Sequence, residues 1–298
     1  MAVEMISKPA ASASASSLSK FTRPLNVIFT YTVIILFALA MLLPFIYALA
    51  NSLKAPQDIA ANPQSLLADP ATGYPATGYQ RVFQRDFPRW TLNSFIFAAA
   101  VTIGNVFFCS MAGYALSRIK FPGRSLAFAA LVGTLMVPGI VLLIPRFLIL
   151  KQIGLVDTYG GLIIPVLAGA FGVFLMRQFF ESIPADIEEA AAIDGASRIR
   201  MFFVVILPIA IPALTALAIF SFQGAWNDFT GPLVSVGSNK ELWTLPLGLA
   251  FLRGSTGQAL EWDLLLAGAV ITTLPMAIIF FIFQRFFMES ATYTAVKG

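Results

Sequence analysis

Charged side chains are sparse in this sequence, and its densest group of acids lies within residues 188–208, EEAAAIDGASRIRMFFVVILP. Glu188, Glu189 and Asp194 can form ion pairs with cations of another molecule. The alanines at 190–192 have little bulk, so a second surface can approach the backbone closely. The stretch therefore has the chemistry of a contact surface, and its use depends on the elements that position it.

Several catalytic chemistries lack their residues in this chain. There is no histidine, which excludes imidazole metal sites, histidine bases and Ser-His triads. The one cysteine, Cys109, lies in an apolar run, so it is expected to be a buried, unreactive thiol. No G-x-x-x-x-G-K-[ST] loop is present to bind ATP phosphates. We therefore expect no catalytic residue, no metal and no cofactor in this chain.

The composition favours a lipid environment. The chain has 298 residues, of which 58% are hydrophobic and only 11% are charged, and its mean hydropathy is +0.82. Soluble domains carry roughly 25% charged residues. A helix needs about 20 apolar residues to cross a bilayer, and six such runs lie at 25–50, 94–116, 125–150, 158–176, 201–222 and 264–283. The predicted fold is an all-α polytopic membrane protein with six transmembrane helices.

Prolines interrupt several of these runs. Pro138 and Pro145 lie in the third run, Pro208 and Pro212 in the fifth, and Pro275 in the sixth. A proline inside a membrane helix frees a carbonyl and bends the helix, which is tolerated where neighbours or a water-filled path satisfy that carbonyl. The prolines thus indicate either a transport path or irregular packing. The first run is longer than the apolar core of a signal peptide, so we expect it to remain a transmembrane helix.

The distribution of basic residues predicts the orientation. With six helices both termini share one side, and that side collects eleven Lys and Arg against eight on the other. The positive-inside rule places the larger group, and both termini, in the cytoplasm. The expected boundaries are a disordered cytoplasmic tail at 1–23, a transmembrane domain at 24–288 with external loops at about 51–93 and 223–263, a cytoplasmic loop at 181–200, and a cytoplasmic C-terminal tail at 289–298.

The two expected external loops differ in composition. The first is rich in Pro, Gly and Tyr, which is typical of a structured loop or a cap of short helices. The second is semi-apolar but broken by Gly and Pro, so it cannot span the bilayer. Such a loop is expected to pack on the bundle or to meet a partner protein.

The acidic stretch falls in the cytoplasmic loop. Pro184 suits a first helical turn, and Gly195 provides a stop at which a positive φ is inexpensive. A second helix is expected to restart near Ser197. A short surface helix tied at both ends to transmembrane helices can transmit force from a soluble protein as a lever. It can equally be an amphipathic turn that only caps the bundle, and the residues alone leave both possibilities open.

The spacing within this loop resembles that of a known family. Glu-Ala-Ala at 189–191, Gly195, Val205 and Leu207-Pro208 resemble the EAA loop of ABC importer permeases, with valine where isoleucine is frequent. The fuller form EAAxIDGA resembles the carbohydrate-uptake subgroup. The segments WNDF at 226–229, TLPLGL at 244–249 and AGAVITTLP at 267–275 are similar to the second permease of maltose-type importers.

This resemblance implies a type I importer permease that is itself non-catalytic and forms half of the path for a carbohydrate. The EAA loop would couple to a separate ATPase through Glu188, Glu189, Ala190, Ala191, Asp194, Gly195 and Ala196. The implied partners are a second, homologous permease, an extracytoplasmic solute-binding protein and a cytoplasmic ATPase homodimer, which would bind ATP and Mg. The implied location is the plasma (inner) membrane of a bacterium.

The end of the fifth run supplies candidates for the substrate path, because aromatic rings stack on sugar faces and amides bind sugar hydroxyls. These candidates are Phe222, Gln223, Trp226 and Asn227. Aromatic residues at such positions can also be interfacial anchors. In the first external loop, Arg81, Arg85 and Arg89 could favour an anionic sugar or a sugar phosphate, or they could simply be solvated.

Two other classes of function remain as alternatives. An ion-coupled secondary transporter typically has ionisable residues within the membrane and internal repeats. The six runs contain essentially no charge except Arg146, and no repeat is evident. A polytopic enzyme would need a catalytic constellation, and no carboxylates cluster at the ends of the runs. The permease interpretation is therefore preferred.

Overall fold

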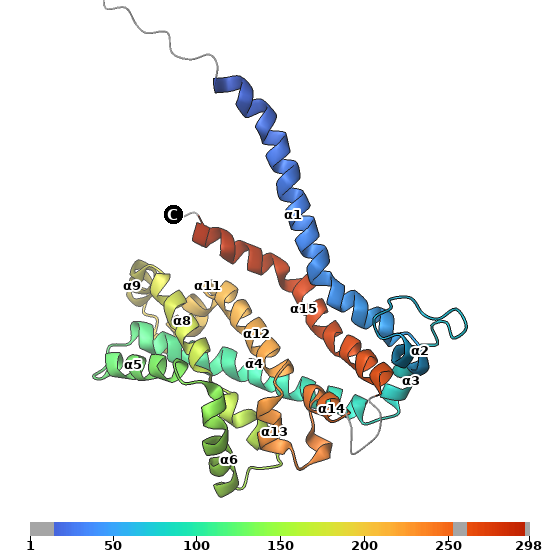
Figure 1. Cartoon of the computed structure of the whole chain (residues 1–298). Helices are drawn as coiled ribbons and strands as arrows, with labels where there is room; N and C mark the ends of the chain where they lie inside the picture. The colour runs from blue at the N-terminus through green and yellow to red at the C-terminus, as the bar shows by residue number, and fades with distance from the viewer. Residues whose placement is uncertain (1–14, 253–260, 296–298) are drawn as a thin grey trace, which may run out of the picture.

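A computed structural model describes the backbone of residues 15–252 and 261–295, and the side chains of 27–252 and 261–284. Every regular element within these ranges is helical (Figure 1). The α-helices are α1 Ala15–Ser52, α2 Pro56–Ala61, α3 Thr77–Phe83, α4 Phe87–Arg118, α5 Arg124–Leu135, α6 Leu143–Gln152, α7 Tyr159–Ile163, α8 Ala170–Ser182, α9 Ala185–Ile193, α10 Arg198–Arg200, α11 Leu207–Ile209, α12 Ile211–Trp226, α13 Thr230–Val236, α14 Leu245–Phe251 and α15 Trp262–Ala295. Short 3-10 turns occur at Gly139–Leu142, Ile164–Val166 and Lys240–Leu242, and a π-helix at Met201–Ile206.

The prediction of a membrane-spanning helical fold is confirmed, but two of the six expected helices are broken. Four segments are long and apolar enough to cross a bilayer: Val27–Ser52, Phe87–Arg118, Tyr159–Ser182 and Trp262–Gln284. Two further pairs qualify only together, Arg124–Leu135 with Gly139–Gln152, bent by 98°, and Arg198–Ile209 with Ile211–Trp226, bent by 79°. The breaks fall beside Pro138 and between Pro208 and Pro212, where proline removes backbone donors.

Both terminal helices extend into segments that were expected to be tails. α1 begins at Ala15, inside the tail expected to be disordered, and residues 1–14 lie outside the described range. α15 continues to Ala295, because no glycine or proline between Met276 and Ala295 ends the helix. Helical structure therefore extends beyond the expected boundaries at 23 and 289.

α4 is the central helix of the bundle, and α8 and α12 pack along it (Figure 1). Gly172 of α8 lies where the three helices meet. A Cβ at this position would lie 2.8 Å from Cys109 Sγ of α4 and 2.9 Å from Leu217 Cδ1 of α12. The close approach of three helices therefore requires a glycine here.

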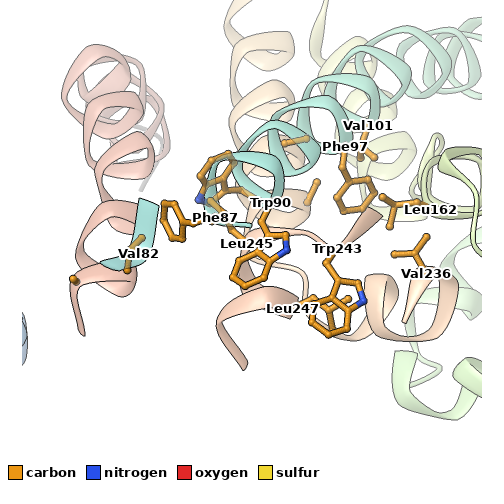
Figure 2. Packing of buried hydrophobic residues seen from close by; sticks show 14 of the residues in the cluster. Val82, Phe87, Trp90, Phe97, Val101, Leu162, Val236, Trp243, Leu245 and Leu247 are labelled. Atoms are coloured by element: carbon orange, nitrogen blue, oxygen red, sulfur yellow. The ribbon is translucent and has the colours of Figure 1, made fainter. Parts of the chain in front are cut away.

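Two hydrophobic clusters lie along α4. The tryptophan cluster (Figure 2) comprises Val82, Phe87, Trp90, Phe97, Ala98, Val101, Leu162, Ala225, Trp226, Val236, Trp243, Leu245, Leu247, Leu264 and Ala267. The phenylalanine cluster comprises Cys109, Tyr114, Leu116, Val173, Met176, Phe180, Ile183, Met201, Phe202, Ile206, Ala210, Ala213 and Leu217. The first gathers the elements at one end of the bundle, and the second gathers those next to α9.

Both expected external loops contain short helices. The first forms α2 and α3, as a cap of short helices would. The second forms α13 and α14, whose Val236, Leu245 and Leu247 are buried in the tryptophan cluster. Of the two outcomes expected for this loop, packing on the bundle is therefore correct for its described residues, whereas 253–260 lie outside them.

Polar side chains of α4 hold this loop in place. Asn93 Nδ2 donates to the carbonyls of Glu241 (2.8 Å) and Trp243 (2.9 Å), and its Oδ1 accepts from the Tyr159 hydroxyl at 2.6 Å. Ser94 Oγ accepts from the Leu245 amide at 2.8 Å. The bonds to Glu241, Trp243 and Leu245 satisfy backbone groups that the interrupted helices leave without an internal partner.

Asn105 performs the same task at the gap between α7 and α8. Its Nδ2 donates to the Val166 carbonyl at 2.9 Å, and its Oδ1 accepts from the Gly169 amide at 2.9 Å. A gap in a membrane helix leaves backbone groups that need a partner outside the helix. One amide side chain on the neighbouring helix thus satisfies both edges of the gap.

We expect Asn105→Leu to destabilise the protein by about 1–3 kcal/mol, because the Val166 carbonyl and the Gly169 amide lose their partner. Thr134→Val is the matched control, since the Thr134 hydroxyl is exposed and bonds only to Leu131 of its own helix. Its effect should stay within about 0.5 kcal/mol. SDS titration of both variants in dodecyl maltoside measures the difference. Equal midpoints for the two variants would contradict the assignment.

Candidate functional site

α9 forms where the sequence predicts a short helix. Pro184 precedes its first residue with an extended backbone (φ −56°, ψ 137°). At its other end Gly195 has φ +78°, the Ala196 amide donates to the Ala191 carbonyl and the Gly195 amide donates to the Ala192 carbonyl, both at 3.0 Å. This pair of bonds is a Schellman motif, which favours glycine. Ser197 then caps the next helix by accepting from the Arg200 amide at 3.3 Å.

Arg118, the last residue of α4, anchors α9 to the bundle. Its Nε lies 2.9 Å from Glu188 Oε1, and both side chains are 17% exposed. Its Nη2 donates to the carbonyl of Phe180 at 2.7 Å and to that of Ile183. The guanidinium therefore joins the end of α4, the end of α8 and the first turns of α9. From the sequence, Arg118 contributed only to the count of basic residues, because nothing in its spacing pairs it with Glu188.

The structure divides the seven candidate coupling residues into two groups. Glu188 faces inward, and Ala191 packs against the phenylalanine cluster together with Ile187, while Ala196 is half-buried. The exposed members are Glu189, Ala190, Asp194 and Gly195. Ile187, Ala190, Ala191 and Asp194 have the i, i+3, i+4, i+7 spacing of one helix face, but only Ile187 and Ala191 point toward the bundle.

Two isoleucines add apolar area to the exposed side of this loop. Ile193 is 87% exposed and Ile199 is 73% exposed, on either side of the Gly195 turn. Ile193 lies beside the exposed Asp194, whereas Ile199 lies between the exposed Arg198 and Arg200, so the surface is mixed apolar and charged. In the sequence, each isoleucine is next to a charged residue.

A second candidate site is a cleft of about 290 Å³ between α4, α8 and α12. Its polar groups come from Asn105, Ser221 and Asp228, and aromatic rings of Phe97, Phe171 and Phe220 line it. The Phe171 and Phe220 rings meet edge to face at 5.9 Å and are about half exposed. Aromatic faces combined with a few polar groups are typical of small-molecule sites.

None of the four residues predicted for the substrate path lines this cleft. Trp226 is fully buried, donates from Nε1 to the Thr272 carbonyl at 3.1 Å and stacks on Phe222 at 5.7 Å, so it belongs to the core. Phe222 lines a different, apolar groove, and Gln223 and Asn227 are exposed elsewhere. The cleft instead uses Ser221, Gly224, Ala225 and Asp228. Ser221, Gly224 and Ala225 lie on one face of α12, and Asp228 follows two residues after the end of this helix.

The arginines of the first external loop are paired within the chain. Arg81 contacts Asp263 at 2.8 Å and also Glu261, Arg85 lies 3.5 Å from Glu261, and Arg89 lies 3.6 Å from Glu241. Partial burial alone would lower the pKa of Arg81, but the charges and hydrogen bonds of Asp263 and Glu261 outweigh it and raise the pKa. The pairs of Arg81 tie α3 to the start of α15, and that of Arg89 ties α4 to the turn at Lys240–Leu242. The three arginines therefore do not form an uncompensated anion-binding surface.

Comparison with known proteins agrees with these features. Residues 106–291 match the family described as binding-protein-dependent transport system inner membrane component. The chain is 34% identical to the arabinooligosaccharides transport system permease protein of Halalkalibacterium halodurans, over 86% of this chain and 91% of that protein. It is 34% identical to the trehalose/maltose transport system permease protein of Thermococcus litoralis, over 89% and 94%.

One solved structure shares the whole architecture. It is a chain of a bacterial ABC transporter involved in the import of the acidic polysaccharide alginate, with a TM-score of 0.78 and 23% identity. The match covers 94% of the present chain and 100% of the other. At this identity the likeness establishes a common fold.

We expect Arg118→Met to loosen α9, because the substitution leaves Glu188 and the carbonyls of Phe180 and Ile183 without their cation. The free energy of local opening should fall by about 1–3 kcal/mol, so that amides of 186–193 exchange roughly tenfold faster or more. Glu189→Gln is the control, since Glu189 is exposed and should leave the exchange unchanged. Hydrogen exchange by mass spectrometry measures both, and unaltered protection in Arg118→Met would show that α9 is held by other contacts.

Proposed function

Since this chain belongs to the family of binding-protein-dependent transport system inner membrane components, we propose that it forms half of the translocation path of an ATP-driven carbohydrate importer. The chain is a permease component and a multi-pass protein of the inner membrane. The observation that best supports the mechanism is the attachment of α9, with its exposed acids, to two transmembrane helices through Arg118.

The proposed source of energy is a separate cytoplasmic ATPase homodimer that binds ATP and Mg. Glu189 and Asp194 could meet cations on that partner, while Ile193 and Ile199 supply apolar contact area. A force on α9 would reach α4 and α8 directly, because Arg118 connects all three. A helix that served only as a cap would have no need for a strongly exposed isoleucine beside its acids.

The remaining partners and the orientation follow from the same premise. One chain supplies half of a path, so a second, homologous permease would complete it. An extracytoplasmic solute-binding protein would deliver the substrate to the end of the bundle that bears α13 and α14. Both termini would then lie in the cytoplasm of a bacterium, as the excess of basic residues on that side predicts.

The substrate class is proposed from the relatives. Two of them are named as permeases for arabinooligosaccharides and for trehalose or maltose. The cleft between α4, α8 and α12 has aromatic rings, an amide, a hydroxyl and a carboxylate, which suit a hydroxyl-rich ligand. An ion-coupled secondary transporter is not favoured, since the matching family and relatives are components of binding-protein-dependent systems.

The orientation can be tested with impermeant thiol reagents. In a Cys109→Ala background we expect Lys120→Cys and Glu189→Cys to be labelled only after the membrane is permeabilised. Tyr74→Cys and Asn62→Cys, both exposed in the first external loop, should be labelled in intact cells or spheroplasts. Labelling of the introduced thiol at 189 from outside would invert the topology and contradict the proposed contact with a cytoplasmic ATPase.

The lever can be tested at the Gly195 turn. A Cβ at this position meets no neighbour, but φ +78° strains a β-branched side chain by about 1–2 kcal/mol. We expect Gly195→Val to insert and to pair with the second permease, yet to lose transport and to release or uncouple the ATPase. Gly195→Asn is the matched control, because asparagine tolerates this conformation, and it should keep most of the transport.

Reversal of the charge at Glu189 tests the same surface independently of backbone strain. We expect Glu189→Lys to lose transport and ATPase retention, since a lysine would face the cations of the partner. Glu189→Gln should have a smaller effect. Uptake and co-purification are measured on matched amounts of membrane protein, and near-normal transport in both Gly195→Val and Glu189→Lys would leave α9 as a surface cap.

A further inference from the structure

The cleft between α4, α8 and α12 has a charged lining residue that the proposed function does not yet use. All of its lining residues lie in the described part of the chain, and Asp228 is the single ionisable one among them. Asp228 Oδ1 accepts from the Gly231 amide at 3.0 Å. Asp228 Oδ2 lies against Gly231 and makes no hydrogen bond within the described residues, so the carboxylate can accept further hydrogen bonds.

Arg146 of α6 lies near Asp228. Both groups border the Cα of Gly231, where an added Cβ would clash with Asp228 Oδ2 and would lie 3.5 Å from Arg146 Nη1. Arg146 Nη2 also reaches Ser235 Oγ of α13 at 3.5 Å. Arg146 does not line the cleft. The pair thus presents its negative member to the cleft and keeps its positive member between α6 and α13.

The character of the cleft distinguishes it from other grooves on the bundle. The neighbouring groove formed by Thr102, Ile103, Val106, Phe107, Phe202 and Phe203 is almost entirely apolar and suits lipid chains. A carboxylate that faced hydrocarbon would be costly, so ionisable groups within membrane proteins usually face a bundle interior or a water-filled path. Asp228 therefore indicates that this face borders an aqueous path.

The helix α8 begins at the cleft, and the partial positive charge of its N-terminus reduces the negative electrostatic potential there. A helix N-terminus has roughly half a positive elementary charge, and Gly169, which caps α8, lines the cleft. The Gly169 amide is already engaged by Asn105. Half a positive charge offsets only part of the unit charge of a carboxylate, and Arg146 does not line the cleft, so the nearest full charge that a ligand meets is negative.

We propose that this cleft is a binding subsite for uncharged, hydroxyl-rich glycans, in which Asp228 selects against anionic ones. The Asp228 carboxylate accepts hydrogen bonds from sugar hydroxyls, while the exposed rings of Phe171 and Phe220 contact the apolar face of a sugar ring. Arg146 balances the carboxylate without lining the cleft. The inference rests on the proposed carbohydrate transport, and it decides between the neutral and anionic substrates that the sequence left open.

The charge of the cleft can be measured without knowing the substrate. In a Cys109→Ala background, Ser221→Cys places a thiol in the cleft of the complete complex in proteoliposomes. The rate of modification is compared between cationic trimethylammonioethyl and anionic sulfonatoethyl methanethiosulfonate, and each is normalised to a free thiol in solution. Asn62→Cys, in the exposed first external loop, serves as a matched control.

We expect the introduced thiol at 221 to prefer the cationic reagent. Asp228→Asn should lower this preference by about tenfold and reverse it, because Arg146 then has no counter-charge. The double variant Asp228→Asn with Arg146→Gln should show almost no preference. If Asp228→Asn left the ratio of the cationic to the anionic modification rate unchanged, the proposal would be overturned. Absence of labelling by either reagent would also overturn it, because the second permease would then cover this face.

Protection of the same thiol tests the ligand class. Maltotriose or arabinotriose at millimolar concentration should slow its modification, whereas trigalacturonate should not, and in Asp228→Asn trigalacturonate should protect. With Asp228 in place, equal protection by all three glycans, or protection by none of them, would contradict a neutral-glycan subsite. Uptake of the labelled neutral glycans by the same proteoliposomes tests the proposed function separately. If the complex transports the neutral glycans but the thiol experiments give the contrary results, the proposed function stands and only the proposed subsite is rejected.

Discussion

Saturation of backbone hydrogen bonds within a lipid environment is the constraint on which this architecture depends. A backbone amide or carbonyl that faces hydrocarbon without a partner costs several kcal/mol, yet two of the six membrane segments are sharply bent and a third has a gap before α8. The continuous helix α4 resolves this conflict with polar side chains placed opposite the interruptions. Asn93 and Ser94 satisfy the loop before α14, Asn105 satisfies the gap before α8, and Arg118 satisfies the end of α8. The carbonyls at the C-terminal end of α4 also have a partner, because Arg124 donates to those of Leu116 and Ser117.

This pattern connects the two candidate sites mechanically. α8 begins at the cleft, where Gly169 and Gly172 line it, and ends at the carbonyls bound by Arg118. A helix of its 13 residues is about 20 Å long. Because packed helices move as rigid bodies rather than deform continuously, a displacement of α9 would be felt at the cleft through α8. The π-helix and the bend before α12 lie on the other connection from α9 to the cleft, and π-helical turns are frequent at functional sites.

Compensation of charge separates structural from functional ionisable groups in this protein. The arginines of the first external loop meet Asp263, Glu261 and Glu241, and Arg118 meets Glu188, so these groups hold elements together. Glu189 and Asp194 are exposed at α9, and Asp228 lines the cleft. The proposed contact groups are thus among those that form no ion pair within the described residues. This distinction is invisible in a sequence, where paired and unpaired carboxylates look alike.

The sequence by itself determined the features that depend on composition and local chemistry. Long apolar runs predicted a helical membrane protein, and the spacing around Gly195 predicted both α9 and its glycine-terminated end, because a positive φ is a local property of the backbone. Prolines at 138, 208 and 212 marked where helices break. They did not predict the angles of the two bends, which are 98° and 79°. Only the tertiary structure decided which face of each helix is buried, lines the cleft or forms an ion pair. It buried Trp226 against Phe222 and Thr272, turned Asp228 into the cleft, and paired Glu188 with an arginine 70 residues earlier. Those outcomes depend on how helices distant in sequence rotate and pack, and in a membrane, where most helix faces are equally apolar, periodicity does not reveal that rotation.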